Sequence, residues 1–216
     1  MPATVNANLL RIASMFISTE VTRYYLQGVL IQRHQLKGVN LVATDGHRMI
    51  VIWDENGHTS LDDVIVRLDK ATLAACKPVK GEHLDRIARI DGDGVLSVLS
   101  GDEKPVPVSI SYQAIIDGTF PHWQRVVPNM AREAGIPTFN PKYVTDFCKV
   151  ATELCASKTG ALSIAGSADS PALIRFQGVQ HVFGVLMPIR NNEDVGALPS
   201  FLNAEQEQPT FQEAAE

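Results

Sequence analysis

The chain has 216 residues, of which 45% are hydrophobic and 20% charged, the balance of an ordinary globular protein rather than a disordered one. No apolar run approaches the ~18 residues that a membrane helix needs, and the first residues lack the features of a signal peptide. We therefore expect a cytoplasmic protein that spans no membrane. The three cysteines form no CxxC pair, which argues against a disulfide scaffold or a zinc site and predicts buried, reduced thiols at Cys76, Cys148 and Cys155.

The net charge of −5 is unevenly distributed along the chain. Residues 1–190 carry 19 basic and 18 acidic side chains, so this part is nearly neutral. Residues 191–216 carry no Lys or Arg, and they hold six acids, Glu193, Asp194, Glu205, Glu207, Glu213 and Glu216. We expect a flexible acidic tail. A neutral body can still present one sign of charge on one face, so the overall charge does not exclude a nucleic-acid partner.

Three stretches have the apolar periodicity of amphipathic helices. They cover residues 9–17, 69–77 and 140–154. The predicted N-caps are Asn6 or Asn8, Asp69 and Asn140. The second helix ends where Pro78 follows, and the third begins with Pro141 at its first position.

Apolar runs between these helices predict β-strands, and Asn56-Gly57 after one of them is a hairpin signal. The predicted strands are residues 3–5, 29–31, 41–43, 49–53, 64–66, 88–90, 95–98, 106–110, 162–164, 173–176 and 182–187. One helix followed by several strands thus occurs three times, at intervals of about 70 residues. This order predicts an α+β fold built from repeated strand-helix-strands units.

Ala43-Thr44-Asp45-Gly46-His47-Arg48 is the most conspicuous string for chemistry. Asp45 and His47 would serve as an acid–base pair in a small hydrolase, but no third ligand or nucleophile accompanies them at a suitable spacing. An Asp-Gly pair between two apolar strands is also what a hairpin needs, because glycine adopts positive φ without strain. We therefore favour a structural turn here. Asp91-Gly92-Asp93-Gly94 lacks the ligands of a calcium loop and predicts another turn, and no metal or cofactor is expected.

Basic residues recur on the polar faces of the predicted helices. Lys70 and Lys77 are seven positions apart on the second helix, as are Lys142 and Lys149 on the third, and two helical turns return to nearly the same face. Arg11 lies on the polar side of the first helix. A solvated face explains any single helix, whereas three basic faces suit contact with one phosphate backbone.

Several segments resemble the bacterial DNA polymerase III beta subunit, the sliding clamp. The first two are Thr22-Arg23-Tyr24-Tyr25-Leu26-Gln27-Gly28-Val29-Leu30 and Val42-Ala43-Thr44-Asp45-Gly46-His47-Arg48-Met49. Residues 118–128 are similar to the end of that protein's middle domain, residues 139–144 to the start of its last helix, and residues 185–190 to its C-terminal strand. The five segments occur in the family's order between residues 20 and 190.

The resemblance implies a DNA-clamp fold, with helices lining a channel and sheets outside. The beta subunit has six units in three domains, and this chain resembles its middle domain followed by only the final unit. We expect a complete two-unit domain over residues 1–128, a linker over 129–138, a third unit over 139–190 and the tail over 191–216.

The implied function is that of a non-catalytic processivity factor, an accessory subunit of a DNA polymerase that encircles double-stranded DNA without sequence specificity. By resemblance, linear peptides of the replicative polymerase and the clamp loader, rich in Gln, Leu and Phe, would bind in an apolar pocket. The family's pocket carries over to Leu26, Thr44, Gly46, His47, Arg48, Met49, Pro121, Arg125, Val126, Val185, Met187, Pro188, Ile189 and Arg190. The DNA-binding candidates are Arg23, Tyr24 and Tyr25, by resemblance, together with Arg11, Lys70, Lys77, Lys142 and Lys149.

Two other functions remain open from the sequence. One is a phage or plasmid clamp homologue that acts as an adaptor or decoy for host replication proteins, and the more distant one is the small hydrolase. The family's rings contain twelve units, so three units per chain favour a homo-oligomeric ring of four copies, with a dimer as the alternative. The third unit is expected to expose an apolar helix flank and a sheet edge that pair with its own copy, while first units form the second two-fold contact.

Overall fold

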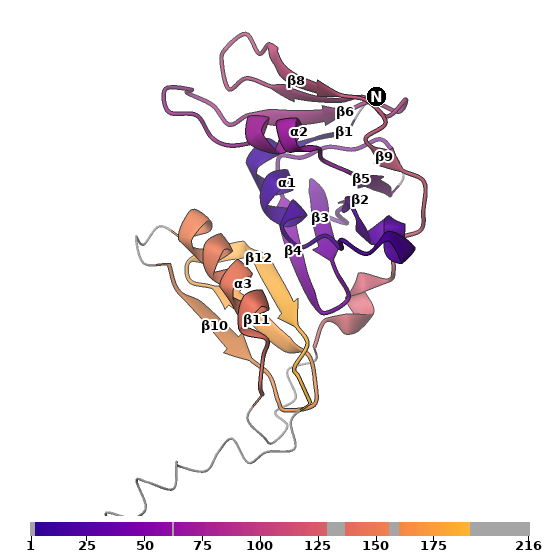
Figure 1. Ribbon diagram of the computed structural model, residues 1–216. Helices are drawn as coiled ribbons and strands as arrows, with labels where there is room; N and C mark the ends of the chain where they lie inside the picture. Colours follow the sequence, from indigo (N-terminus) through magenta and orange to yellow (C-terminus); the bar gives the residue numbers. More distant parts are fainter. Residues whose placement is uncertain (1–2, 62, 129–136, 156–159, 191–216) are drawn as a thin grey trace, which may run out of the picture.

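The computed structural model describes residues 3–61, 63–128, 137–155 and 160–190, and these residues form an α+β structure (Figure 1). The α-helices are α1 (Ala7–Ser14), α2 (Lys70–Ala75) and α3 (Pro141–Leu154), and the short 3₁₀ helices are η1 (Val21–Leu26) and η2 (Trp123–Val126). The strands are β1 (Ala3–Asn6), β2 (Val29–Arg33), β3 (Val39–Thr44), β4 (Arg48–Asp54), β5 (Val64–Val66), β6 (Ile87–Ile90), β7 (Leu96–Leu99), β8 (Pro107–Ser111), β9 (Ile115–Ile116), β10 (Leu162–Ala165), β11 (Ala172–Phe176) and β12 (Val179–Leu186).

The strands form two antiparallel sheets. The smaller sheet has the order β1-β6-β7-β8, and the larger has the order β10-β11-β12-β4-β3-β2-β5-β9. Strand β1 thus pairs within the second unit's sheet, and β5 pairs within the first unit's sheet. Strand β12 of the third unit pairs with β4 through five residue pairs, from Val182 opposite Ile52 to Leu186 opposite Arg48. The third unit therefore extends the sheet of the first.

The predicted caps form, although the helices differ in length from the prediction. The Asn6 side chain accepts from the N–H of Leu9 at 3.1 Å, and the Asn140 side chain accepts from the N–H of Lys142 at 3.0 Å. Asp69 accepts from the N–H of Thr72 at 2.7 Å, and this hydrogen bond lowers the pKa of Asp69 below its usual value. Helix α2 ends at Ala75, so Lys77 lies beyond it and the predicted seven-residue spacing on one helix is wrong there.

The strands of the larger sheet have apolar runs that no polar residue interrupts, because both faces of this sheet are covered by other parts of the chain. Along β4, Ile50 and Ile52 belong to the main core under the helices, while Met49 and Val51 belong to a second cluster on the opposite face. That second cluster packs against side chains from the η1 and η2 segments, including Tyr25. Alternation within a strand thus places apolar residues on two covered faces.

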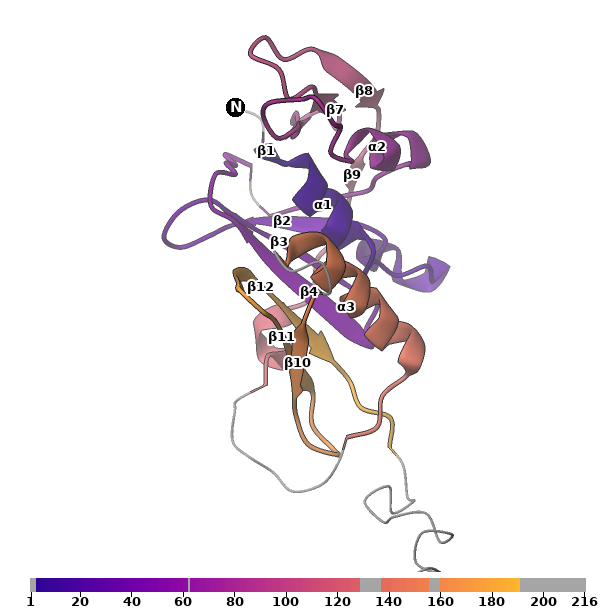
Figure 2. The same ribbon diagram turned by 90° about the vertical axis from the view of Figure 1, so that its left-hand side faces the viewer.

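The three α-helices lie on one side of the sheets, with α1 between α2 and α3 (Figures 1 and 2). Phe16, just after α1, packs on Phe147 of α3 with ring centroids 4.8 Å apart. Gly184 of β12 makes this packing possible, because a Cβ there would lie 2.2 Å from the Phe147 ring. One hydrophobic core therefore includes helices from the first and third units.

Other local predictions have mixed outcomes. Asp91–Gly94 forms the predicted turn, with Asp91 N–H donating to the Val95 carbonyl at 2.9 Å. Asn56-Gly57 also forms a turn, but the predicted hairpin is wrong, since β5 pairs with β2 and β9 rather than with β4. Cys76 and Cys155 are buried as predicted, and burial raises the pKa of Cys76 to about 11, whereas Cys148 is exposed.

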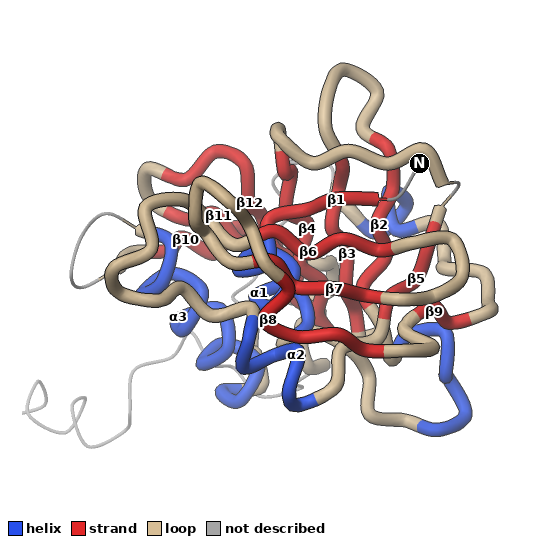
Figure 3. Tube along the Cα trace, turned by 90° about the horizontal axis from the view of Figure 1, so that it is seen from above, coloured by secondary structure: helices blue, strands red, loops and turns tan. Residues whose placement is uncertain are grey.

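Four strands end the two sheets, β1 and β8 in the smaller sheet and β10 and β9 in the larger one. Strand β8 is one outer strand of the smaller sheet (Figure 3). It carries the exposed apolar side chains of Val108 and Ile110, and Val106 and Tyr112, also exposed, flank it. Strand β10 ends the larger sheet, as expected for the third unit. The expected apolar helix flank is wrong, because the exposed residues of α3 are mainly polar, namely Pro141, Lys142, Thr145, Cys148, Lys149, Thr152 and Glu153. Most of the predicted linker, residues 129–136, and the tail lie outside the described residues.

Candidate functional site

An apolar cavity of about 370 Å³ lies on the second face of the larger sheet, where β4 and β12 pair. It has the size and the mainly apolar lining of a site for a small ligand or a peptide side chain. Four segments line it: η1, the β3–β4 turn, the segment that includes η2, and the end of β12. The lining residues are Arg23, Tyr25, Leu26, Thr44, Gly46, His47, Arg48, Met49, Phe120, Pro121, His122, Trp123, Val126, Val185 and Met187.

The β3–β4 turn forms one wall of the cavity and is held by its own polar groups. Asp45 accepts from the N–H groups of His47 at 2.9 Å and Arg48 at 3.0 Å, while Gly46 has a φ of +90°. The Thr44 hydroxyl donates to the Arg48 carbonyl at 2.8 Å, and His47 stacks on Tyr143 of α3. The turn prediction is therefore confirmed at Asp45-Gly46.

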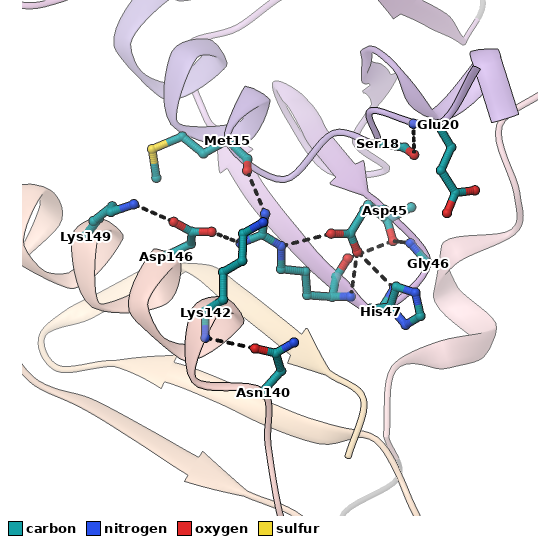
Figure 4. Close-up of polar contacts among 12 residues, drawn as sticks. Met15, Ser18, Glu20, Asp45, Gly46, His47, Asn140, Lys142, Asp146 and Lys149 are labelled. Atoms are coloured by element: carbon teal, nitrogen blue, oxygen red, sulfur yellow. Dashed lines mark hydrogen bonds and ion pairs between the residues drawn. The ribbon is translucent and has the colours of Figure 1, made fainter. Parts of the chain in front are cut away.

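The guanidinium of Arg48 lies at the centre of a polar network behind this wall. It donates to Asp45 at 3.1 Å, to the Met15 carbonyl at 3.1 Å and to Asp146 of α3. Met15, Asp45 and Asp146 converge on this one group (Figure 4). The guanidinium also lies 4.8 Å from the Phe16 ring centroid. These contacts join the end of α1, the β3–β4 turn and α3 through one side chain. Only 8% of the Arg48 side chain is exposed, so it does not point into solvent at the cavity mouth.

Asp146 is the acidic centre of the same network. Burial by itself would raise its pKa, but the hydrogen bonds from Lys149 and Arg48, and their positive charges, lower it below its usual value. The Lys149 ammonium donates to Asp146 at 2.6 Å on the exposed side, and Arg48 donates from the buried side. Asp146 is therefore a carboxylate at neutral pH, as its two cationic partners require.

The structure brings together most of the predicted pocket residues. Those in the cavity wall are Leu26, Thr44, Gly46, His47, Arg48, Met49, Pro121, Val126, Val185 and Met187, while Arg125, Pro188, Ile189 and Arg190 are not part of it. The predicted set did not include Phe120, His122 and Trp123 in this role, although they stand beside Pro121 in the matched segment. It assigned Arg23 and Tyr25 to DNA, whereas both line the cavity.

The DNA-binding candidates differ in what they expose. Lys70, Lys77, Lys142 and Lys149 are exposed, and Lys149 shares Asp146 with Arg48. Arg11, the DNA-binding candidate on α1, already has protein partners: its guanidinium bonds to Asn8 and pairs with Glu153 of α3, and 12% of its side chain is exposed.

The Arg23-Tyr24-Tyr25 segment lies in η1. Tyr24 is exposed, and Arg23 pairs with Glu20 at 3.3 Å. Tyr25 is half-buried against the second apolar cluster. The segment thus combines a packing role with an exposed surface beside the cavity.

The structure gives no support to the hydrolase interpretation. Both oxygens of Asp45 accept hydrogen bonds from its own turn or from Arg48, and the His47 ring stacks on Tyr143. Among the described residues, no three His, Cys, Asp or Glu side chains come close enough to hold a metal ion. In the same residues, no helix combines the length and the apolar character needed to cross a bilayer.

No protein-family model matches the sequence, and no curated protein matches it either. Solved structures do match. A DNA polymerase sliding clamp from Pseudomonas aeruginosa, solved with a ligand, has a TM-score of 0.61 at 18% identity over 88% of this chain and 66% of that protein. The clamp from Bartonella birtlesii, bound to griselimycin, has a TM-score of 0.58 at 21% identity over 86% of this chain and 64% of that protein. The clamp from Bacillus subtilis has a TM-score of 0.59 at 17% identity, with shares of 88% and 64%.

These comparisons confirm the predicted fold class. The chain has the α+β fold of a bacterial sliding clamp in a shortened form, and it spans about two thirds of the length of the clamps that it matches.

Proposed function

We propose that the protein is a sliding-clamp-like processivity factor, which holds a DNA polymerase on double-stranded DNA and has no catalytic activity of its own. The observation that carries this proposal is the apolar cavity at the β4–β12 junction of a clamp fold. An open cavity lined by Met49, Val185 and Met187 suits the apolar side chains of an extended peptide, because Met adapts to varied shapes. Linear peptides of the polymerase and of a clamp loader are the proposed occupants.

DNA binding in this proposal uses phosphate contacts alone. A protein that slides must hold the backbone without reading base edges, so exposed lysines on or beside helices suit it better than a base-reading constellation. Lys70 begins α2 and Lys77 follows its end, while Lys142 and Lys149 lie on α3, and α2 and α3 flank α1 on one side of the sheets (Figure 2). We place the DNA channel along that side.

The proposed ring contains four copies, joined through two of the four outer strands, β8 and β10. Strand β8 occupies in the second unit the place that β4 occupies in the first, but β4 pairs with β12, whereas β8 has no partner on its outer side among the described strands. The contact between first units, expected from the sequence, is therefore replaced by a contact between second units through β8. Strands related by a two-fold axis pair antiparallel, and this contact would cover Val108 and Ile110. Strand β10 would make the other two-fold contact.

A peptide-binding measurement tests the proposed function. The probe is a fluorescent synthetic peptide, Gln-Leu-Ala-Leu-Phe, titrated with the full chain. Met187 and Ile189 lie two residues apart and are similarly exposed, at 40% and 48%, but only Met187 lines the cavity. Met187→Ala should weaken peptide binding about ten-fold, the effect of losing one anchor contact of ~1.4 kcal/mol, and Ile189→Ala should leave it unchanged. Equal binding by the wild type and Met187→Ala would refute the cavity assignment.

A further inference from the structure

The described chain ends beside the cavity. Val185 and Met187 line the cavity, and Arg190, the last described residue, follows Met187 by three positions. The following 26 residues, 191–216, lie outside the described structure. Residues 191–216 are therefore attached to the body of the chain three residues after a lining residue of the apolar cavity.

The sequence of residues 191–216 contains one concentrated apolar segment. Leu198, Phe201 and Leu202 fall within five positions, in a stretch that otherwise consists largely of Ala, Glu, Gln, Asn and Pro. Leu198 is eight residues beyond Arg190, and eight residues span up to about 28 Å when extended. The segment can therefore reach a cavity whose wall begins three residues before Arg190.

Charge also favours this pairing. The tail segment is flanked by acids on both sides, Glu193 and Asp194 before it and Glu205 and Glu207 after it, and no Lys or Arg occurs in residues 191–216. The cavity has Arg23 in its wall, and the exposed Arg125 follows two residues after the lining residue Trp123. Although Arg23 also pairs with Glu20, at 3.3 Å, that pair is exposed and open to exchange.

We infer that residues 198–202 of the chain occupy the cavity of their own molecule and compete there with partner peptides. This inference rests on the proposed function, because it takes the cavity to be a peptide site. Tethering gives the segment an effective concentration on the order of 1 mM. A segment whose separate affinity is about 0.1 mM would thus lower the apparent affinity of an added peptide about ten-fold.

The test compares full-length chains that differ only in the tail. The probe is a fluorescent peptide with the sequence of residues 195–207, and its binding is followed by anisotropy. We expect the Leu198→Ser, Phe201→Ser, Leu202→Ser triple variant to bind this probe about ten-fold more tightly than the wild type. Phe211→Ser, the same kind of change outside the segment, should behave like the wild type. Equal affinities of the triple variant and the wild type would overturn the inference.

Two further arms identify the site and the source of the competition. In the triple-variant background, Met187→Glu should abolish probe binding while Ile189→Glu should not, and binding that survives Met187→Glu would place the segment elsewhere. The ratio of the probe's dissociation constants for the wild type and the triple variant should not depend on protein concentration. A ratio that grows with concentration would mean that the segment binds a second copy, contrary to the inference.

A parallel titration with Gln-Leu-Ala-Leu-Phe separates this inference from the proposed function. If that peptide binds the triple variant and loses binding in Met187→Glu, while the 195–207 peptide does not bind, the cavity remains a peptide site and only the tail inference fails. If neither peptide binds the triple variant, both fail.

Discussion

The guanidinium of Arg48 donates to the carboxylate of Asp146, which lies 98 positions later in the chain. Arg48 belongs to the strand next to the turn that walls the cavity, and Asp146 belongs to the helix that carries Lys142 and Lys149. Together with the β4–β12 pairing, this contact fixes the third unit against the first. The shape of the cavity and the position of the proposed DNA-binding lysines therefore depend on the same junction.

Removing one partner of this pair should destabilise the fold. Asp146→Ala leaves the buried guanidinium without one acceptor, and we expect a loss of about 2–3 kcal/mol in the free energy of unfolding, measured by urea titration. Lys149→Ala removes the exposed partner of the same carboxylate and should cost less than about 1 kcal/mol. Similar losses in the two variants would show that the buried Arg48–Asp146 contact contributes no more to stability than the exposed Lys149–Asp146 pair.

The same pair predicts a dependence of stability on pH. Because the pKa of Asp146 is lower in the folded chain than its ordinary value of 3.8, the carboxylate contributes stability that is complete above that value and is lost as the pH falls through the folded pKa. The stability difference between the wild type and Asp146→Asn should thus stay constant above about pH 5 and shrink as the pH falls below 3.8 toward the folded pKa. Urea titrations at several pH values measure it, and a difference that stays constant would contradict the assignment.

Charge reversal tests the proposed DNA surface. Lys70→Glu with Lys77→Glu should weaken binding to duplex DNA and flatten the dependence of affinity on salt, because each lost phosphate contact lowers that slope by about one. Lys37→Glu with Lys104→Glu makes the same change of charge at exposed lysines outside the helices. If both double variants lose affinity equally, net charge rather than the helical side of the molecule accounts for binding.

The outer strands predict the stoichiometry. Sedimentation at micromolar concentration should give a mass near four chains for the wild type. Ile110→Lys places a charge in the exposed row of β8 and should leave pairs joined through β10. Ser109→Lys, on the neighbouring position of the same strand, is the matched control and should remain tetrameric. A wild type that sediments as a single chain would contradict the ring.

Local signals explain why parts of this fold could be predicted. The caps at Asp69 and Asn140 and the Asp45-Gly46 turn depend on neighbours within a few residues, so sequence patterns show them. The length of α2 could not be predicted in the same way. It ends at Ala75, although no proline occurs before Pro78.

Long-range pairing explains most of what the sequence missed. No residue near Asn56-Gly57 indicates that the next strand, β5, pairs with β2. Likewise, no residue near Arg11 indicates that its guanidinium forms an ion pair with Glu153. The apolar run of β4 does not indicate on which face of the sheet the cavity lies, since both faces are covered. Cys148 is exposed because it lies on the outward side of α3, beside the exposed Thr145, Lys149 and Thr152. Resemblance supplied the pocket residues that periodicity alone did not.

Retention on duplex DNA with blocked ends tests the central claim most directly. The protein is incubated with a linear duplex that carries biotin at both ends, streptavidin is then added to block the ends, and the complex is moved into high salt. A ring around DNA should remain on the blocked duplex and be lost when the ends stay free, because it slides along the backbone without holding any site. Equal loss from blocked and free duplexes in high salt would show that the protein binds DNA only from outside, and would contradict the clamp function.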